Sequence, residues 1–389
     1  MTEDKGRIEG SSVWTSLDRK SVAMIEFTLG QYRRRMSTWV IVAVSTMLIA
    51  LIGLVYIDDV QNFDATVFQV DNDGDGLFSE DGFDTLDNDE DCQSQTFTIQ
   101  KDTNGNNVMC DVEIIERSTG VTYIPDSRVD EDPDEAALER EITHRGYVLA
   151  TAKLGIGFIV PLLLSLFLAT NLIRDEIENE TMHYISGKPL DRGEILGYRL
   201  IAYLIIVWPV IAALCLLQAL VCIIIGPSEG MLRFDDIGIW VSAMLAGWLI
   251  CLAYGALFSV FGSVHRFGGV GALFIGLWET MMGFLTLGFP NIPVTRMSLV
   301  RWGYDLVDAA VPRAWADANT LSAKIETVDY PEGFRGEEIT TDGLEGWFGG
   351  TPFNLTPFLS SVVSVLVLLF FTALCLFIGR TVLSTRELE

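Results

Sequence analysis

Carboxylates recur at every second position in one stretch of the chain, Asp71-Asn-Asp73-Gly-Asp75-Gly76. Because Ca²⁺ takes about six to eight oxygen ligands, a loop that turns at Gly76 can point Asp71, Asp73 and Asp75 at one ion. An EF-hand loop needs a bidentate Glu at its twelfth position, where this chain has Gly82. The spacing therefore predicts an irregular Ca²⁺ site, and a solvated acidic loop is the alternative.

This Asp-rich stretch resembles the Ca²⁺ repeats of extracellular proteins such as thrombospondin type 3 modules. The resemblance implies that Asp81 and Asp84 complete the ligand shell.

Groups that could catalyse a reaction are scarce. The three histidines, His144, His183 and His265, form no H-E-x-x-H zinc motif, and the chain has no G-x-S-x-G elbow and no G-x-x-x-x-G-K-[ST] phosphate loop. We therefore expect a protein that is not an enzyme and binds no ATP by itself. Glu279 lies near the centre of an apolar run, where a carboxyl is costly and must face the protein interior or a cavity. A pathway residue and a link between helices fit this position equally well.

The elements that must position these groups are six apolar stretches of 20 to 26 residues. They are 38–57, 154–173, 200–225, 239–261, 268–289 and 357–378. About 20 helical residues cross a hydrocarbon core, whereas apolar stretches of about 10 to 14 residues are typical of soluble core helices. The sequence therefore predicts an all-α polytopic membrane protein with six transmembrane helices.

Lysine and arginine indicate the orientation. If the N-terminus is inside, the inner segments hold 14 of the 26 basic residues in 80 positions; these segments are 1–37, 174–199, 262–267 and 379–389. The other 12 basic residues are spread over the longer outer segments. Because cytoplasmic loops carry an excess of Lys and Arg, both termini are expected in the cytoplasm. The outer segments 58–153, 226–238 and 290–356 then sum to the whole net charge of −26. This acidity excludes nucleic acid as a partner, because binding a polyanion takes a basic surface.

The outer segment 58–153, between the first two spans, is large enough for a small domain. Cys92 and Cys110 are its two cysteines, and we expect them to form a disulfide because disulfides persist outside the cytoplasm. The other four cysteines fall within spans and are interpreted as small core residues: Cys215, Cys222, Cys251 and Cys375.

Two further features are expected at the outer membrane surface. Lys153, at the edge of the second span, can extend its amine to the surface and needs no other role. Leu299, Trp302, Leu306 and Ala310 recur at helical spacing, which predicts a helix lying on the membrane.

The residue pattern of the inner loop 174–199 predicts a helix, a turn and a second helix. Gly187 and Pro189 end the helix that continues from the second span. Asp191 caps a second helix that continues into the third span, and Glu194 completes a capping box. A charged hairpin on two rigid helices is suited to receiving force from a soluble partner; an ordinary inner turn is the alternative.

This hairpin resembles the signature of ABC-2 type transporter permeases, which have six spans and two inner termini. The matching residues are Glu176, Glu178, Thr181, Pro189, Arg192, Glu194 and Gly197, whereas Glu180 and Tyr198 stand where a Gly and a Lys are usual. The resemblance implies a coupling helix that docks on a separate ATPase subunit. It also implies two copies of that ATPase and a permease dimer, formed with a second copy or a related chain.

The segment before the first span resembles the interface helix of the same family. Ile25, Leu29, Tyr32 and Met36 form an apolar stripe opposite the basic run 33–35, so the segment can lie along the inner membrane surface. By resemblance, Glu26 faces the ATPase.

Together these features predict the permease subunit of an ABC exporter in the cell membrane, driven by ATP hydrolysis in a partner. One alternative is a non-transporting envelope protein whose Ca²⁺-stabilised outer loop binds a cell-surface component. Another is a proton-coupled transporter that uses Glu279. The spans carry no cluster of charges, which favours a lipid-like or hydrophobic cargo, or transmission of force to an outer partner.

Overall fold

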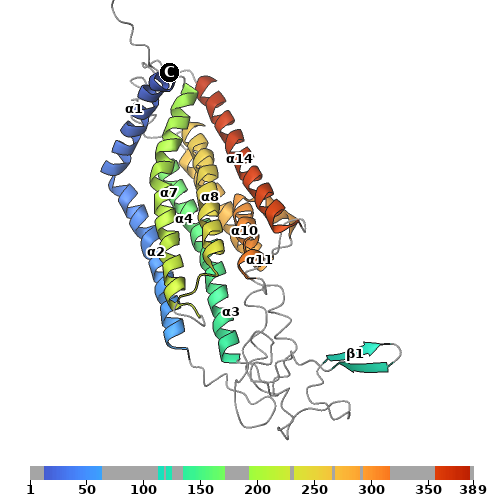
Figure 1. Cartoon of the computed structure of the whole chain (residues 1–389). Coiled ribbons are helices and arrows are strands. Elements are labelled where there is room, and N and C mark those ends of the chain that lie inside the picture. The colour runs from blue at the N-terminus through green and yellow to red at the C-terminus, as the bar shows by residue number, and fades with distance from the viewer. Residues whose placement is uncertain are drawn as a thin grey trace, which may run out of the picture.

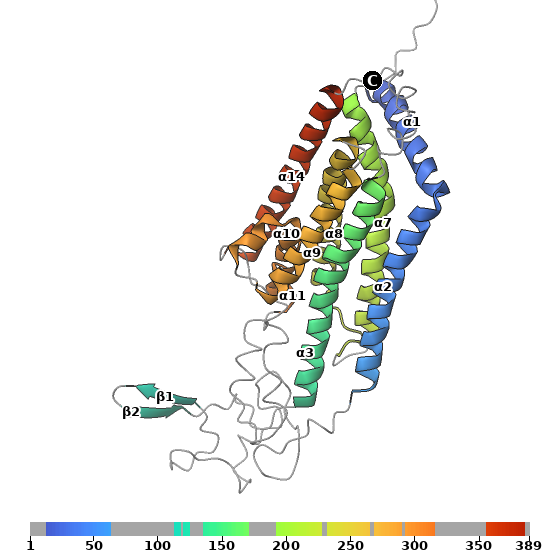
Figure 2. The same cartoon turned by 180° about the vertical axis from the view of Figure 1, so that it is seen from behind.

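The long helices of the protein run side by side in one bundle (Figures 1 and 2). The computed structural model describes residues 13–63, 113–117, 120–124, 135–170, 192–227, 232–264, 268–289, 292–315 and 355–385. The Asp-rich stretch, both outer cysteines and most of the inner hairpin lie outside the described residues.

Within the described residues, six helices are long and apolar enough to cross a membrane, as predicted. Five are regular α-helices: α2 (Met36–Gln61), α7 (Arg192–Ile225), α8 (Ile237–Val264), α9 (Gly268–Gly288) and α14 (Pro357–Thr385). The other span is a continuous helix of four parts: α3 (Glu135–Ala150), the π-helix η3 (Thr151–Ile159), α4 (Val160–Leu164) and the π-helix η4 (Ser165–Ala169). The predicted all-α, six-span membrane protein is therefore confirmed.

A further helix and a pair of strands lie before α3 in the chain. Helix α1 (Val13–Arg34) precedes α2, and the extended backbone of Arg35 separates the two helices and forms an elbow. Strands β1 (Glu113–Arg117) and β2 (Gly120–Ile124) pair antiparallel, with Glu113 opposite Ile124.

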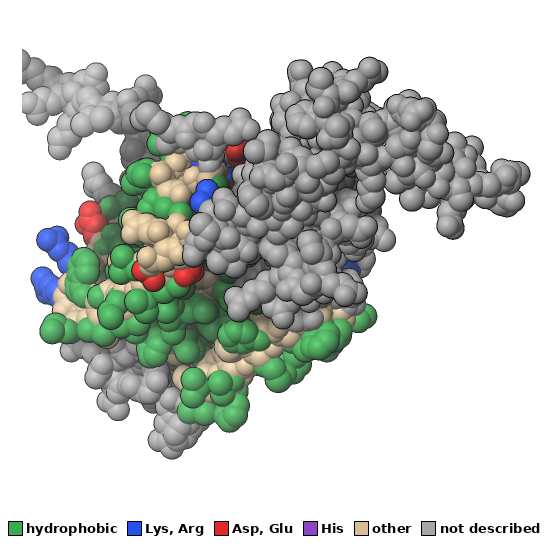
Figure 3. Space-filling view, turned by 90° about the horizontal axis from the view of Figure 1, so that it is seen from below, with side chains coloured by type: hydrophobic (Ala, Val, Ile, Leu, Met, Phe, Trp, Pro, Cys, Tyr) green, Lys and Arg blue, Asp and Glu red, His purple; other side chains and the backbone are tan. Residues whose placement is uncertain are grey.

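The two ends of the bundle carry different parts of the chain. Helix α1 and the end of α14 lie together at one end, here called the terminal end (Figure 1). Helix α2 ends and α3 begins at the opposite end, here called the loop end (Figures 1 and 2). Viewed from the loop end, the flanks of the described part are covered mainly by hydrophobic side chains (Figure 3). Such a surface suits a surrounding of lipid chains.

Helix α8 forms the centre of the bundle and packs against α7, α14, η3 and η4. Its small residues permit close approach: a Cβ on Gly247 would lie 2.8 Å from the Ile156 carbonyl oxygen of η3. Helix α2, by contrast, is the least buried of the six spans.

The helix predicted on the membrane surface is instead buried. After the short helix η5 (Pro293–Met297), α10 (Leu299–Asp308) packs against α8, α9, η3 and α14, and α11 (Val311–Ala314) follows it. Leu299 and Leu306 are buried as its stripe predicts, but Tyr304, Asp305 and Asp308 on its other faces are buried too. The surface prediction was wrong because these polar groups lie among partners inside the protein.

The second span also begins earlier in the chain than the apolar stretch 154–173. Its helix starts at Glu135, and the part that is long and apolar enough to cross a membrane starts at Arg140. The additional turns include Glu141, Arg145 and Lys153, whose charged partners lie within the bundle.

Candidate functional site

Five buried side chains join three segments at the loop end of the bundle. We call them the loop-end cluster: Tyr56 of α2, Glu141 and His144 of α3, and Arg233 and Asp236 before α8. The hydroxyl of Tyr56 lies 2.5 Å from Nδ1 of His144, and Nε2 of His144 lies 2.8 Å from Oδ2 of Asp236. A carboxylate can only accept a hydrogen bond, so the Nε2–H of His144 donates to Asp236. The other ring nitrogen, Nδ1, forms the hydrogen bond with the Tyr56 hydroxyl.

The guanidinium of Arg233 forms hydrogen bonds with both acidic residues of the cluster, Glu141 and Asp236. Its Nη1 and Nη2 donate to the two carboxylate oxygens of Glu141 at 2.5 and 2.6 Å, and its Nε donates to Asp236 at 3.0 Å. The Arg145 Nε–H also donates to Glu141, at 2.5 Å. Such bidentate, charge-assisted bonds are among the strongest that side chains make.

Charge and burial oppose each other at Asp236, which precedes α8 and lies outside the six spans. Burial raises the pKa of this carboxyl, but the hydrogen bond from His144 and the positive charge of Arg233 outweigh burial and hold the pKa below its usual value. The indole of Trp315, which follows α11, also donates to Asp236, at 3.0 Å. Asp236 is therefore held as a carboxylate and joins the cluster to Trp315.

A second link at the loop end uses neutral groups. The Tyr147 hydroxyl donates to Oε1 of Gln218 in α7 at 2.5 Å, and the Gln218 amide donates to the Ile49 carbonyl of α2 at 2.6 Å. The rings of Tyr147 and Tyr56 stack with their centroids 4.0 Å apart. Helices α2, α3 and α7 are thus bonded to one another near the cluster.

Glu279 of α9 caps the first turn of α10. Its Oε2 accepts hydrogen bonds from the Ser298 hydroxyl at 2.6 Å and from the backbone N–H groups of Leu299 at 3.1 Å and Val300 at 3.3 Å. The hydroxyl of Tyr254 in α8 donates to the same oxygen at 2.9 Å. The first N–H groups of a helix lack intrahelical partners, so a carboxylate from a neighbouring helix satisfies them. These contacts make Glu279 a link between α8, α9 and α10; its role in a pathway stays a prediction.

Lys153 does not extend to the membrane surface. Its side chain is only 2% exposed, and its Nζ lies 2.5 Å from Oδ1 of Asp308, which ends α10. A second ion pair, Arg301 Nε to Asp305 Oδ1 at 2.8 Å, lies within α10 itself. The expected snorkelling was wrong because α10 supplies a buried carboxylate to the amine.

Helix α1, at the terminal end, differs from the loop-end cluster in that its described charged side chains are exposed. Glu26, Arg33 and Arg34 of α1 are exposed, whereas Tyr32 is buried and its hydroxyl donates to the Leu168 carbonyl of η4 at 2.9 Å. Helix α1 packs on α7, whose first turn contains the exposed Glu194.

Comparison with known proteins identifies a family for this chain. The family model described as ABC-2 family transporter protein matches residues 22–295. The chain belongs to the ABC-2 transporter family. No curated protein and no solved structure matches it. As a member of this family it is an ABC transporter permease and a multi-pass membrane protein, a transport component that is not itself catalytic.

The coupling residues predicted for this ABC-2 permease are mostly outside the described residues, namely Glu176, Glu178, Thr181 and Pro189. Arg192 begins α7, and Glu194 and Gly197 lie in its first two turns. The predicted Ca²⁺ ligands Asp71, Asp73, Asp75, Asp81 and Asp84 and the pair Cys92 and Cys110 also lie outside the described residues. The four cysteines of the spans are buried free thiols, as expected.

Sequence reasoning missed the loop-end cluster of the permease. Glu141, His144, Arg233 and Asp236 fall in the predicted outer segments, because charged residues lie beyond the ends of the apolar stretches, and Tyr56 falls in the predicted first span. One signal was present: Glu141, His144 and Arg145 recur at spacings of three and four, which places them on one side of a helix. Their partners, about 90 residues further along, could not be named from spacing.

Proposed function

We propose that this ABC-2 permease is the membrane subunit of an exporter whose movements are driven by ATP binding and hydrolysis in two separate ATPase subunits. The terminal end would face the cytoplasm and receive the ATPases, and the loop end would face outward. The exposed Arg33 and Arg34 at the terminal end favour this orientation, since Lys and Arg gather on the cytoplasmic side of a membrane.

The observation that carries the proposal is the length and path of α7. This helix runs without interruption for 34 residues from Arg192, at the root of the hairpin, to Ile225. At about 1.5 Å per residue it is roughly 50 Å long, enough to pass through a bilayer. A push on the hairpin by a closing ATPase would therefore act on one continuous helix, in which the interior Pro209 removes one backbone hydrogen bond.

At its far end, α7 carries the residues that meet the other spans. The Gln218 amide donates to the Ile49 carbonyl of α2, and the Arg233 N–H of the loop-end cluster donates to the Ile223 carbonyl of α7 at 3.0 Å. We propose that the loop-end cluster holds the outer ends of the spans together between transport events. Displacement of α7 would then strain these bonds first.

The test is purification of the full chain from its own membranes in mild detergent, with the companion proteins identified by mass spectrometry. We expect a P-loop ATPase in stoichiometric amount, and we expect Arg192→Glu to reduce its recovery and the coupled ATPase activity by at least tenfold. Arg380→Glu, an exposed site near the end of α14 at the same end of the bundle, is the control and should change neither. Recovery of the chain without any ATPase, together with no effect of Arg192→Glu, would reject the exporter.

The Asp-rich outer stretch is proposed as a separate, Ca²⁺-stabilised and disulfide-bonded element of this permease. Its support is the spacing of Asp71, Asp73 and Asp75 and the position of Cys92 and Cys110 in the same outer segment. Calorimetric titration of the full chain with Ca²⁺, compared with an Asp73→Asn/Asp75→Asn variant, tests it. Absence of a difference in heat at millimolar Ca²⁺ would leave a solvated acidic loop.

A further inference from the structure

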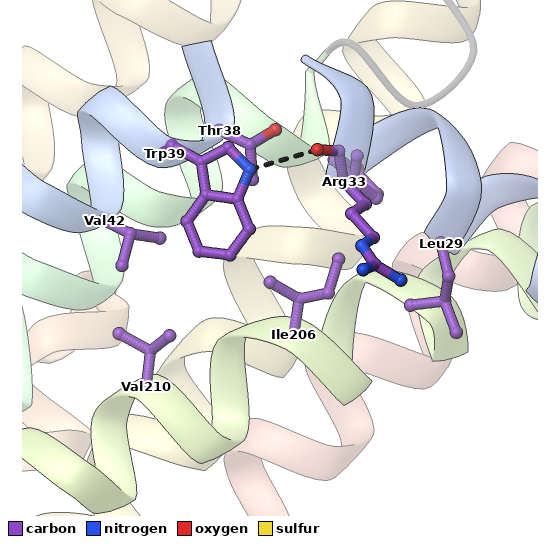
Figure 4. A pocket seen from close by; sticks show the side chains of 8 residues that line it. Leu29, Arg33, Thr38, Trp39, Val42, Ile206 and Val210 are labelled. Atoms are coloured by element: carbon purple, nitrogen blue, oxygen red, sulfur yellow. Dashed lines mark hydrogen bonds between the residues drawn. The ribbon is translucent and has the colours of Figure 1, made fainter. Parts of the chain in front are cut away.

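An open cavity of about 360 Å³ lies inside the elbow between α1 and α2, against the middle of α7. Its walls are mostly apolar and include Leu29 of α1, Val42 of α2 and Ile206 and Val210 of α7. Figure 4 shows the side chains of Trp39 and Arg33 reaching from the elbow toward these α7 residues. We call this cavity the elbow groove.

One part of the elbow groove is polar, and its polar groups are suited to an anion. Arg33 lines the groove, is exposed, and forms no ion pair with any described residue. Thr38 also lines it and is only 4% exposed, yet its hydroxyl has no hydrogen-bond partner in the described part of the chain. A buried hydroxyl without a partner is uncommon in proteins and points to a group that is bound there.

The start of α2 adds to this polarity. The helix begins at the groove with no side-chain cap and no acidic residue in its first turn. Its first N–H groups are therefore open to an acceptor, and the positive end of its dipole faces the same place. Arg34 and Arg35 follow Arg33 directly and increase the positive charge around the elbow.

We propose that the elbow groove binds a phospholipid with an anionic headgroup. The phosphate would accept hydrogen bonds from Arg33 and Thr38, and an acyl chain would lie along Val42, Ile206 and Val210. The chain crosses a membrane, and α2 is the span whose surface is least covered by the rest of the protein, so lipid has access to the groove. Trp39 is 59% exposed and its indole donates to the Arg33 carbonyl at 3.1 Å, which is the amphipathic placement typical of a tryptophan at a membrane interface.

A lipid in this place would bridge the two arms of the elbow. The headgroup would contact the end of α1 and the start of α2, and the acyl chain would contact α2 and α7. Because the extended residue Arg35 is the joint between the arms, occupancy would fix the angle between α1 and the bundle. The lipid is thus a structural ligand of the permease, distinct from any cargo.

The experiment uses quenching of tryptophan fluorescence by phospholipids whose acyl chains are brominated. Full-length protein in detergent is titrated with brominated phosphatidylglycerol or brominated phosphatidylcholine, and the signal of Trp39 is obtained as the difference between wild type and Trp39→Phe. We expect Trp39 to be half-quenched at a roughly fivefold lower concentration of the anionic lipid, as one arginine near an anionic headgroup implies. Arg33→Gln should abolish this preference, Thr38→Val should reduce it, and Arg33→Lys should keep most of it.

The matched control is Arg313→Gln, at an exposed arginine of α11, which should leave the preference unchanged. Equal quenching of Trp39 by the two lipids would overturn the proposal, since the headgroup would then have no role. Absence of Trp39 quenching by either lipid would also overturn it. In that case Val42→Cys, which would form a disulfide-linked dimer on oxidation, would identify a second copy of the chain as the occupant.

Discussion

At the loop end, five side chains from three segments form buried ion pairs and hydrogen bonds, whereas at the terminal end Glu26, Arg33 and Arg34, the charged side chains of α1 that the structure describes, are exposed. The loop-end bonds join residues about 90 positions apart, such as Glu141 with Arg233 and His144 with Asp236. At the terminal end, α1 is joined to η4 by a neutral bond from the Tyr32 hydroxyl to the Leu168 carbonyl, and Arg199 near the start of α7 is a buried charged group. The terminal end also contains the elbow and its groove, where the chain changes direction.

This difference indicates which end is rigid. Buried charged groups tolerate little displacement, because separating a pair leaves a charge without compensation. Exposed charges exchange protein partners for water at small cost. A transporter that receives force at one end and holds a closed barrier at the other would need this arrangement, with an adaptable terminal end and a loop end that opens in one step.

The largest expected effect follows from removing the arginine of the loop-end cluster. Arg233→Met would leave Glu141 and Asp236 without their shared partner, and breaking a buried pair costs about 3–5 kcal/mol. We expect a large drop in the midpoint of thermal unfolding of the detergent-solubilised protein. Arg313→Met, at an exposed arginine of the same end, should have a small effect.

The double variant Arg233→Met/Glu141→Met separates pairing from packing. It removes a carboxylate that keeps Arg145 but has lost its bidentate partner, so it should recover part of the stability lost in Arg233→Met. If the single variant were as stable as the wild type, the cluster would not hold the loop end together, and the contrast between the two ends would disappear.

The next largest effect is expected at Glu279, the cap of α10. Glu279→Leu would leave the Leu299 and Val300 N–H groups and the Tyr254 hydroxyl unpaired, each a loss of about 1–3 kcal/mol. Glu279→Gln keeps an oxygen acceptor in the same place and should unfold close to the wild type. Loss of transport in Glu279→Gln with unchanged unfolding would instead identify the carboxyl as a pathway residue.

The six spans could be predicted from the sequence because each contains an apolar run long enough to cross a membrane by itself. Their boundaries could not, because the start of the second span carries charges. Those charges are tolerated only through partners on other segments, as in the pair of Lys153 and Asp308. These two residues are more than 150 positions apart, so no local sequence pattern could predict that they pair.

Helix α10 illustrates the same limit for the candidate site. Its apolar stripe was visible in the sequence, and so was the cost of Glu279 in a membrane. The connection between them, a carboxylate placed at the start of a buried helix, depends on how α9 and α10 pack. The sequence indicated that α10 has an apolar face and that Glu279 needs a polar partner. It did not indicate which residues provide that partner or cover that face.

A smaller effect is expected from pH at Asp236. Its pKa is lower in the folded protein than in the unfolded chain, where it is about 3.9. The ionised carboxyl therefore stabilises the fold above the unfolded pKa, and this contribution is lost as the pH falls through the folded pKa. The difference in unfolding midpoint between wild type and Asp236→Asn should thus be largest near pH 6 and shrink below about pH 4.

The neighbouring Asp235 provides the matched control for this titration. Its side chain is exposed, and Asp235→Asn should change the unfolding midpoint little at either pH. A difference between wild type and Asp236→Asn that stays constant from pH 6 to pH 3 would contradict the assigned role of the Asp236 charge.

The smallest effects are expected from single tyrosine hydroxyls, and they compare the two ends most directly. Tyr56→Phe removes the bond to His144, and Tyr32→Phe removes the bond to the Leu168 carbonyl; each should cost about 0.5–1.5 kcal/mol. Combined with Asp236→Asn, Tyr56→Phe should deviate from additivity by more than about 0.5 kcal/mol, because His144 joins the two groups. Tyr32→Phe should add to Asp236→Asn within that limit, since no shared partner connects them. Equal coupling of both tyrosines to Asp236 in double-mutant cycles would mean that the bundle responds as one unit, with no separately rigid loop end.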